Sequence, residues 1–266
     1  FAQLKASNAA ISKYLEKTNY TKEEVNGIFT TDWEILRHVR IIKQSYEFGF
    51  DSIEALMNDL KRALKTFNER LDFTLNVNYD GRKIVGDNPN DFNDRDYGNN
   101  DVRAKNGRTH GTHVSGIIAA RRHNGIGING AADNVKIMAI RNTPSGDEYD
   151  KDVALGVYYA VDNGAKVINM SFGKQFSPHS DWVRNAIAYA AEKDVLIVSA
   201  SGNDGKNTDQ INYFPNDQID NGKEVSNTFL KVGASAPRYG STMVADYSNY
   251  GKNTVDVFAP GSQIYS

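Results

Sequence analysis

The clearest indication of the fold comes from residues 150–200, whose sequence is DKDVALGVYYAVDNGAKVINMSFGKQFSPHSDWVRNAIAYAAEKDVLIVSA. Helical patterns over 150–163 and 180–193 are each followed by a short apolar run, 167–170 and 195–200. Short buried strands that alternate with helices are typical of a parallel sheet covered on both faces. This stretch therefore predicts two neighbouring parallel strands with a helix before each.

The same alternation extends in both directions along the chain. A further helical pattern covers about 110–122, and further apolar runs occupy 135–140, 229–232 and 255–258. We therefore expect an α/β fold in three layers, with a mostly parallel sheet flanked by helices. In such sheets the functional site lies beyond the carboxyl ends of the strands.

The N-terminal part has a different character, and we expect residues 1–78 to form a helical insertion or subdomain beside an α/β domain at 79–266. Thr21–Glu24 is a capping-box pattern, and Asp51–Glu54 is another candidate helix start. Apolar side chains after it recur at helical spacing, which predicts a packing face: Ile53, Leu56, Met57, Leu60, Leu64 and Phe67. A partner-binding role for this helical region stays open.

Composition excludes several classes of function. A net charge of −2 over 266 residues gives no indication of nucleic acid or of an anionic membrane as partner. The chain has no cysteine, which excludes disulfides, thiol nucleophiles and cysteine-ligated metals. No apolar run is long enough to cross a bilayer, so no transmembrane segment is expected.

A histidine motif, Gly107-Arg-Thr-His-Gly-Thr-His-Val-Ser-Gly116, precedes the first helix of the α/β part. It places His110 on a Gly/Thr turn at a helix N-terminus, where the helix dipole disfavours the protonated ring and keeps the imidazole available as a general base. A helical zinc pair has His at i and i+4 with Glu between, whereas His110 and His113 are spaced i and i+3. The pattern favours a base, with zinc ligation or a structural role as the alternatives.

Two strand ends carry further polar or small residues. The run 195–200 continues into Ser201-Gly202-Asn203-Asp204-Gly205, where the amide of Asn203 could donate to a developing oxyanion. The run 167–170 continues into Ser171-Phe172-Gly173. Taken alone, the Gly-Asn-Asp-Gly stretch is equally typical of a plain turn.

Together these stretches resemble the subtilisin-like serine proteases (subtilases, peptidase S8). The resemblance covers about residues 107–266 and includes 125–132 and 247–251, all in the family's order. It implies a serine endopeptidase with an Asp-His-Ser triad, in which His110 is the base and Asn203 the oxyanion donor. The implied partner is a polypeptide substrate, and no cofactor is required for the chemistry.

The resemblance also implies substrate-binding residues. Ser171, Phe172 and Gly173 would form one wall of the primary specificity pocket, and Ala200, Ser201 and Gly202 the other. Ser145 and Gly146 lie where the family has a second edge strand, so that an extended peptide would bind by strand addition. Asp147 and Glu148 would add negative charge near the substrate and favour basic residues before the cleaved bond.

Two triad members have no match in the chain, and we expect the Asp and Ser motifs to lie outside it. Gly240-Ser241-Thr242-Met243 looks like a serine motif but precedes the segment that it should follow. Asp80 follows a stretch too polar for a buried strand. The isolated fragment is therefore expected to be inactive. The alternative is a pseudoprotease or peptide-binding module that keeps the cleft without the nucleophile.

The loop at 80–106 is rich in oxygen-bearing side chains, so structural calcium is possible although the spacing is not that of an EF-hand. The candidates are Asp87, Asn90, Asp91, Asn93, Asp94 and Asp96. The alternative is that these residues only form turns. By family resemblance alone, the protein is expected to be secreted or in the cell envelope.

Overall fold

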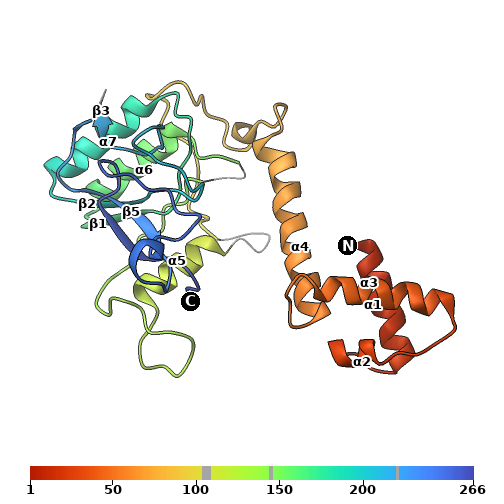
Figure 1. The fold of residues 1–266 in the computed structure, drawn as a ribbon. Helices are drawn as coiled ribbons and strands as arrows, with labels where there is room; N and C mark the ends of the chain where they lie inside the picture. Colours follow the sequence, from red (N-terminus) through yellow and green to blue (C-terminus); the bar gives the residue numbers. More distant parts are fainter. Residues whose placement is uncertain (104–108, 144–145, 220–221) are drawn as a thin grey trace. The chain divides into compact units, whose positions relative to one another are not determined.

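The computed structural model describes residues 1–103, 109–143, 146–219 and 222–266. The chain divides into two compact units, Phe1–Tyr79 and Asp80–Ser266 (Figure 1). The first unit is helical and the second contains the whole of the four-stranded sheet. No helix in the described ranges is both long enough and apolar enough to span a membrane.

The helical unit consists of α1 (Ala2–Leu15), α2 (Lys22–Asn26), α3 (Trp33–Tyr46) and α4 (Ile53–Glu69), and a short π-helical segment, η1 (Arg70–Thr74), continues α4. Ile11, Val25 and Ile42 are fully buried between these helices. Since the three side chains come from α1, α2 and α3, the unit has an apolar core of its own.

Both predicted helix starts in this unit are confirmed. The Thr21 hydroxyl accepts a hydrogen bond from the Glu24 N–H at 3.2 Å, and the Glu24 carboxylate accepts one from the Thr21 N–H at 2.9 Å. Ser52 caps α4 through the N–H of Ala55 at 3.1 Å.

The predicted packing face of α4 is covered only at its beginning. Ile53 and Leu56 are buried, whereas Leu64 and Phe67 are 45% and 62% exposed. Helical spacing shows which side chains share a face but not how far along the helix a neighbour extends. The prediction of a packing face therefore holds for the first turns of α4 alone.

The sheet of the second unit contains β1 (Val167–Met170), β2 (Leu196–Ala200), β5 (Phe229–Ser235) and β6 (Val257–Pro260), in that order and all parallel. A separate antiparallel pair, β3 (Gln218–Ile219) and β4 (Lys223–Glu224), has two residues in each strand. The mostly parallel sheet predicted from the alternating pattern is confirmed.

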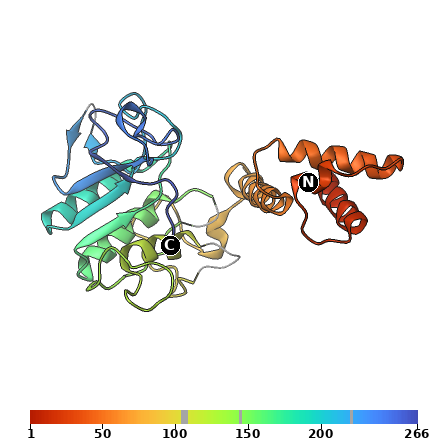
Figure 2. The same cartoon turned by 60° about the horizontal axis from the view of Figure 1, so that its bottom comes forward.

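Two long helices, α6 (Asp150–Asp162) and α7 (Ser180–Glu192), lie side by side against this sheet (Figures 1 and 2). Val157 of α6, Ile187 of α7 and Ile197 of β2 belong to one buried cluster. Successive residues of β2 differ in burial, since Leu196 is 37% exposed while Ile197 is fully buried. The helices therefore bury one set of the strand's alternating side chains.

The helix that carries the histidine motif, α5 (His110–Ala119), differs from a core helix. None of its residues is buried. The Ser266 hydroxyl donates to the carbonyl oxygen of His113 at 3.0 Å, and the N–H of Gly130 donates to Ala120 at 3.0 Å. The end of the chain and a turn thus lie beside α5, as Figure 2 shows for the C-terminus.

One predicted strand is wrong. The structure assigns no strand to residues 135–140, and Val135 and Ile137 are 49% and 47% exposed. The apolar pattern resembles that of a buried strand, but a strand also needs a hydrogen-bonded neighbour. Residues 135–140 have none within the described part of the chain.

The loop that begins at Asp80 is fixed to α6 by buried charges. The Arg82 guanidinium pairs with Asp87 and Asp152, and the Lys151 ammonium lies 2.7 Å from Asp87. The Tyr97 hydroxyl also donates to Asp152, at 2.5 Å. Burial raises the pKa of the Asp87 carboxyl, but Arg82 and Lys151 lower it by more than burial raises it. The pKa of Asp87 is therefore below its usual value.

Candidate active site

The two predicted walls of the specificity pocket lie next to each other. Ser171, Phe172 and Gly173 directly follow β1, whereas Ala200 ends β2 and is followed by Ser201 and Gly202. Met170 pairs with Ser199 in the parallel register, so both segments leave the sheet at the same carboxyl edge. This is the edge at which α/β proteins bind their ligands.

An aromatic ring that was not predicted lies against both walls. A Cβ atom added to Gly173 would lie 2.6 Å from Tyr213 Cε1, and one added to Gly202 would lie 2.4 Å from Tyr213 Cζ. Only glycine leaves room for the ring at these two positions. Burial raises the pKa of the Tyr213 phenol to about 12, so the ring is neutral. The ring forms a surface between the two walls.

The segment that carries Tyr213 is held from two sides. Lys174, which follows the first wall, exchanges two backbone hydrogen bonds with Phe214, at 2.8 and 2.9 Å. The Lys231 ammonium, from β5, donates to the carbonyl oxygens of Tyr213 at 3.1 Å and Pro215 at 2.5 Å. Lys231 is only 5% exposed, so these carbonyls replace the water that an ammonium normally binds.

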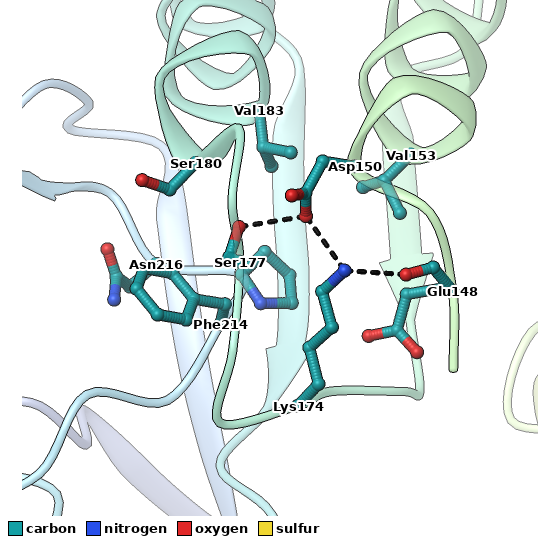
Figure 3. A pocket seen from close by; sticks show the side chains of 10 residues that line it. Glu148, Asp150, Val153, Lys174, Ser177, Ser180, Val183, Phe214 and Asn216 are labelled. Carbon is teal, nitrogen blue, oxygen red and sulfur yellow. Dashed lines mark hydrogen bonds and ion pairs between the residues drawn. The ribbon is translucent and has the colours of Figure 1, made fainter. Parts of the chain in front are cut away.

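A small pocket beside the first wall is lined by a charged network (Figure 3). The Lys174 ammonium lies 2.9 Å from Asp150 and donates to the carbonyl oxygen of Glu148 at 2.6 Å. The Ser177 hydroxyl donates to Asp150 at 2.8 Å. The network ties the segment after β1 to the start of α6.

The expected charge of Glu148 toward substrate needs correction. Glu148 is 6% exposed, and burial raises the pKa of its carboxyl. Asp147 is exposed and is the one of the two that faces solvent. Residues 146–149 form no strand, Gly146 lies in a bend, and Ser145 is outside the described residues. The expected second edge strand is therefore absent from the described part of this segment.

His110 is the first residue of α5 and is exposed. Its ring has no hydrogen bond or ion pair with any described residue, so no carboxylate in the described ranges orients it. His113, one turn later, is half-buried. The described residues contain no group of three metal-ligating side chains, and zinc ligation by His110 and His113 has no third ligand among them.

Asn203 is exposed in a bend directly after the second wall. The preceding Gly202 has φ of 103°, a left-handed conformation that favours glycine. The side chain of Asn203 forms no hydrogen bond with the described residues and is free to donate to a ligand. No measured contact links Asn203 to His110, so their joint role stays a prediction.

Asp80 and Ser241, the two residues of the chain that look like triad members, each lie at or in a short helical turn. Asp80 caps a short 3₁₀ helix, η2 (Gly81–Ile84), by accepting from the N–H of Arg82 at 2.9 Å. Ser241 lies in a three-residue 3₁₀ turn, η3 (Gly240–Thr242), rather than at the start of a buried helix. Neither side chain forms a described hydrogen bond with His110, and that both triad members lie outside the chain stays a prediction.

Several of the oxygen atoms considered for calcium accept hydrogen bonds or form ion pairs within the protein. Asp91 accepts from the N–H of Asn93, Asp94 from that of Asn88, and Asn90 contacts the His179 ring at 3.0 Å. Asp87 lies between two cations, which a calcium ion would have to displace. Structural calcium in this loop stays a prediction.

The parallel sheet flanked by helices defines an α/β protein, and the small-residue walls and the Asn-bearing bend at its carboxyl edge form the candidate site. The chain belongs to the subtilase family, whose model matches residues 40–266. The match starts within the helical unit and includes every predicted site residue.

Similar proteins are themselves proteases. The chain is 38% identical over 188 residues to a thermophilic serine proteinase of Bacillus sp. strain AK1, which covers 70% of this chain and 41% of that protein. It is 36% identical over 172 residues to thermitase of Thermoactinomyces vulgaris, covering 64% and 56%. A cell wall-associated protease of Bacillus subtilis is 41% identical over 187 residues, covering 70% and 17%. The chain thus spans 17–56% of the length of these relatives.

Among solved structures, a protease of Pseudoalteromonas arctica is 35% identical and has a TM-score of 0.46. The likeness covers 57% of this chain and 43% of that chain.

Proposed function

We propose that the full-length protein is a serine endopeptidase and that this chain supplies its general base, His110, and its oxyanion donor, Asn203. The observation that carries the proposal is the family match over residues 40–266, which contains both residues in their motifs. The position of Asn203 beyond the carboxyl edge of the sheet supports the proposal.

In the proposed reaction, His110 removes the proton from a serine hydroxyl as the oxygen attacks the scissile carbonyl. A triad aspartate orients the imidazole and stabilises its charge. We expect this aspartate and the serine outside residues 1–266. The Asn203 amide donates to the oxyanion of the tetrahedral intermediate, and His110 then returns its proton to the leaving amine.

The proposed substrate is an extended polypeptide bound along the strand ends. Ser171–Gly173 and Ala200–Gly202 would contact its backbone and the side chain before the cleaved bond. Because Tyr213 lies between Gly173 and Gly202, the space for that side chain is short. We therefore propose a preference for small side chains at this position. The names of relatives, which include a cell wall-associated and an extracellular protease, support a secreted or cell-envelope location.

The test is hydrolysis of casein and of a chromogenic peptide by the full-length protein, its His110→Ala variant and a His113→Ala control. A base at His110 predicts a loss of activity of at least about 10⁴-fold in His110→Ala. The control should retain most of its activity. A folded full-length protein that cleaves neither substrate would leave a peptide-binding pseudoprotease as the better account. Equal losses in both variants would indicate a structural role for the motif.

A further inference from the structure

The side-chain amide of Asn249 bonds to the turn that follows β2. Its oxygen accepts hydrogen bonds from the N–H groups of Asp204 and Lys206, both at 3.0 Å. Its nitrogen donates to the carbonyl oxygen of Ser201 at 2.9 Å. Asn249 is completely buried, so none of these bonds competes with water.

The backbone of Asn249 holds the same turn. Its N–H donates to the carbonyl oxygen of Gly202 at 2.9 Å, and its own carbonyl oxygen accepts from the Ser201 hydroxyl at 3.1 Å. The neighbouring Ser248 hydroxyl accepts from the N–H of Ala234, in β5, at 2.9 Å. Asn249 is therefore fixed to the sheet as well as to the turn.

Asn249 therefore forms hydrogen bonds with Ser201, Gly202, Asp204 and Lys206. Within residues 201–206, it forms none with Asn203 and Gly205. The backbone of Asn203 is thereby fixed from both sides, while its side chain stays free and exposed. A Cβ atom at Gly202 would lie 2.3 Å from the Asn249 amide nitrogen, so the two residues are closely fitted.

We propose that Asn249 is a positioning residue that holds the turn in the conformation from which Asn203 donates to the oxyanion. This inference rests on the proposed function. A hydrogen-bond donor stabilises an oxyanion effectively only if it already points at the oxygen before the charge develops. Otherwise the free energy needed to reorient the donor offsets the stabilisation of the transition state. Asn249 touches no substrate and acts through Asn203.

Position 249 requires an amide side chain, because this group both donates a hydrogen bond to the turn and accepts two from it. Aspartate at 249 has the same shape and keeps the two accepted bonds, but an ionised carboxylate cannot donate to Ser201 and would repel its carbonyl oxygen. A protonated carboxyl group regains the donor. Asn249→Asp thus changes one hydrogen bond without creating a cavity.

The experiment is a double-mutant cycle in the full-length protein with Asn203→Ala, Asn249→Asp and the double variant, measuring kcat and KM on one peptide. We expect Asn249→Asp alone to lower kcat about 10- to 100-fold with KM within about twofold. In the Asn203→Ala background the same change should lower kcat less than about threefold. The ratio of variant to wild-type kcat should rise as the pH falls and the new carboxyl is protonated.

Two controls separate positioning from loss of stability. Asn253→Asp makes the same change at an exposed site and should leave kcat unchanged. Asp87→Asn destabilises the protein away from the turn and should lower the unfolding temperature without lowering kcat at a temperature where it is folded. If Asn249→Asp does not fold, Asn249→Ser keeps a hydroxyl there and should show the same dependence on Asn203.

Equal losses of kcat with and without Asn203, or no loss in either background, would overturn the positioning role while leaving the protease intact. A wild type that hydrolyses peptides but is insensitive to Asn203→Ala would overturn both the oxyanion role and this inference. A folded wild type without hydrolysis would overturn the proposed function itself, and the inference with it.

Discussion

The Lys231 ammonium donates to the carbonyl oxygen of Pro215 at 2.5 Å from the interior of strand β5. The same ammonium holds the carbonyl oxygen of Tyr213, whose ring lies between the glycines of the two strand ends. A buried cation in the sheet thus supports the surface between the walls. Burial lowers the pKa of Lys231 to about 8, against the opposing effects of Asp217 and Asp256.

The pH dependence of stability should report this buried lysine and its neighbour Asp217. Burial, followed by the charge of Glu224, raises the pKa of Asp217 from 3.8 to about 6. Between these values the folded state binds more protons than the unfolded state, so its contribution to stability falls as pH rises. For Lys231 the unfolded state binds more protons between about 8 and 10.5, so stability rises there. Each change is at most about 3 kcal/mol.

Urea unfolding of wild type and Asp217→Asn from pH 4 to 10 measures both effects. The wild type should lose stability relative to the variant between pH 4 and 6, and Lys231→Met should remove the rise above pH 8. A difference between wild type and Asp217→Asn that is constant from pH 4 to 6 would contradict the assignment.

Shortening Tyr213 should change the cleavage preference of the full-length protein. Tyr213→Ala removes the ring between Gly173 and Gly202 and deepens the space for the side chain before the cleaved bond. The ratio of kcat/KM for a phenylalanine peptide to that for an alanine peptide should rise about tenfold or more. Tyr239→Ala, at a residue that is 96% exposed, is the matched control. An unchanged ratio in Tyr213→Ala would show that the ring does not limit this space.

The ion cluster at Asp87 should be important for stability. Asp87→Asn leaves Lys151, whose side chain is fully buried, and Arg82 short of a counter-charge. The expected loss in the free energy of unfolding is about 3–5 kcal/mol. The exposed pair of Arg238 and Asp246 provides the control, because Asp246→Asn should cost less than about 1 kcal/mol. Denaturant titration of both variants checks this, and similar losses would argue against a special role for the buried cluster.

The sequence predicts local features of the fold well. Thr21 and Ser52 cap helices as expected, and the apolar runs at 167–170 and 195–200 form adjacent parallel strands. The run at 135–140 has the same apolar character but no pairing partner in the described structure. Strand formation depends on a neighbour distant in the sequence, which the composition of one segment does not reveal.

The contacts that organise the candidate site could not be predicted from the sequence. Asn249 bonds to Ser201 from 48 residues further along the chain, and Tyr213 lies against Gly173, which comes much earlier in the sequence. Nothing in the local sequence around either residue indicates these contacts. Lys231 can be recognised in the sequence, since a charged residue interrupts an otherwise apolar strand run there. A lysine in such a run predicts a buried cation with specific acceptors.

The most direct test of the central claim is labelling of the full-length protein by a serine-directed phosphonate, measured by intact mass. The account predicts one adduct per chain in the wild type and in His113→Ala, and none in His110→Ala over the same time. No adduct on a folded wild type, or equal labelling of wild type and His110→Ala, would contradict a catalytic serine activated by His110.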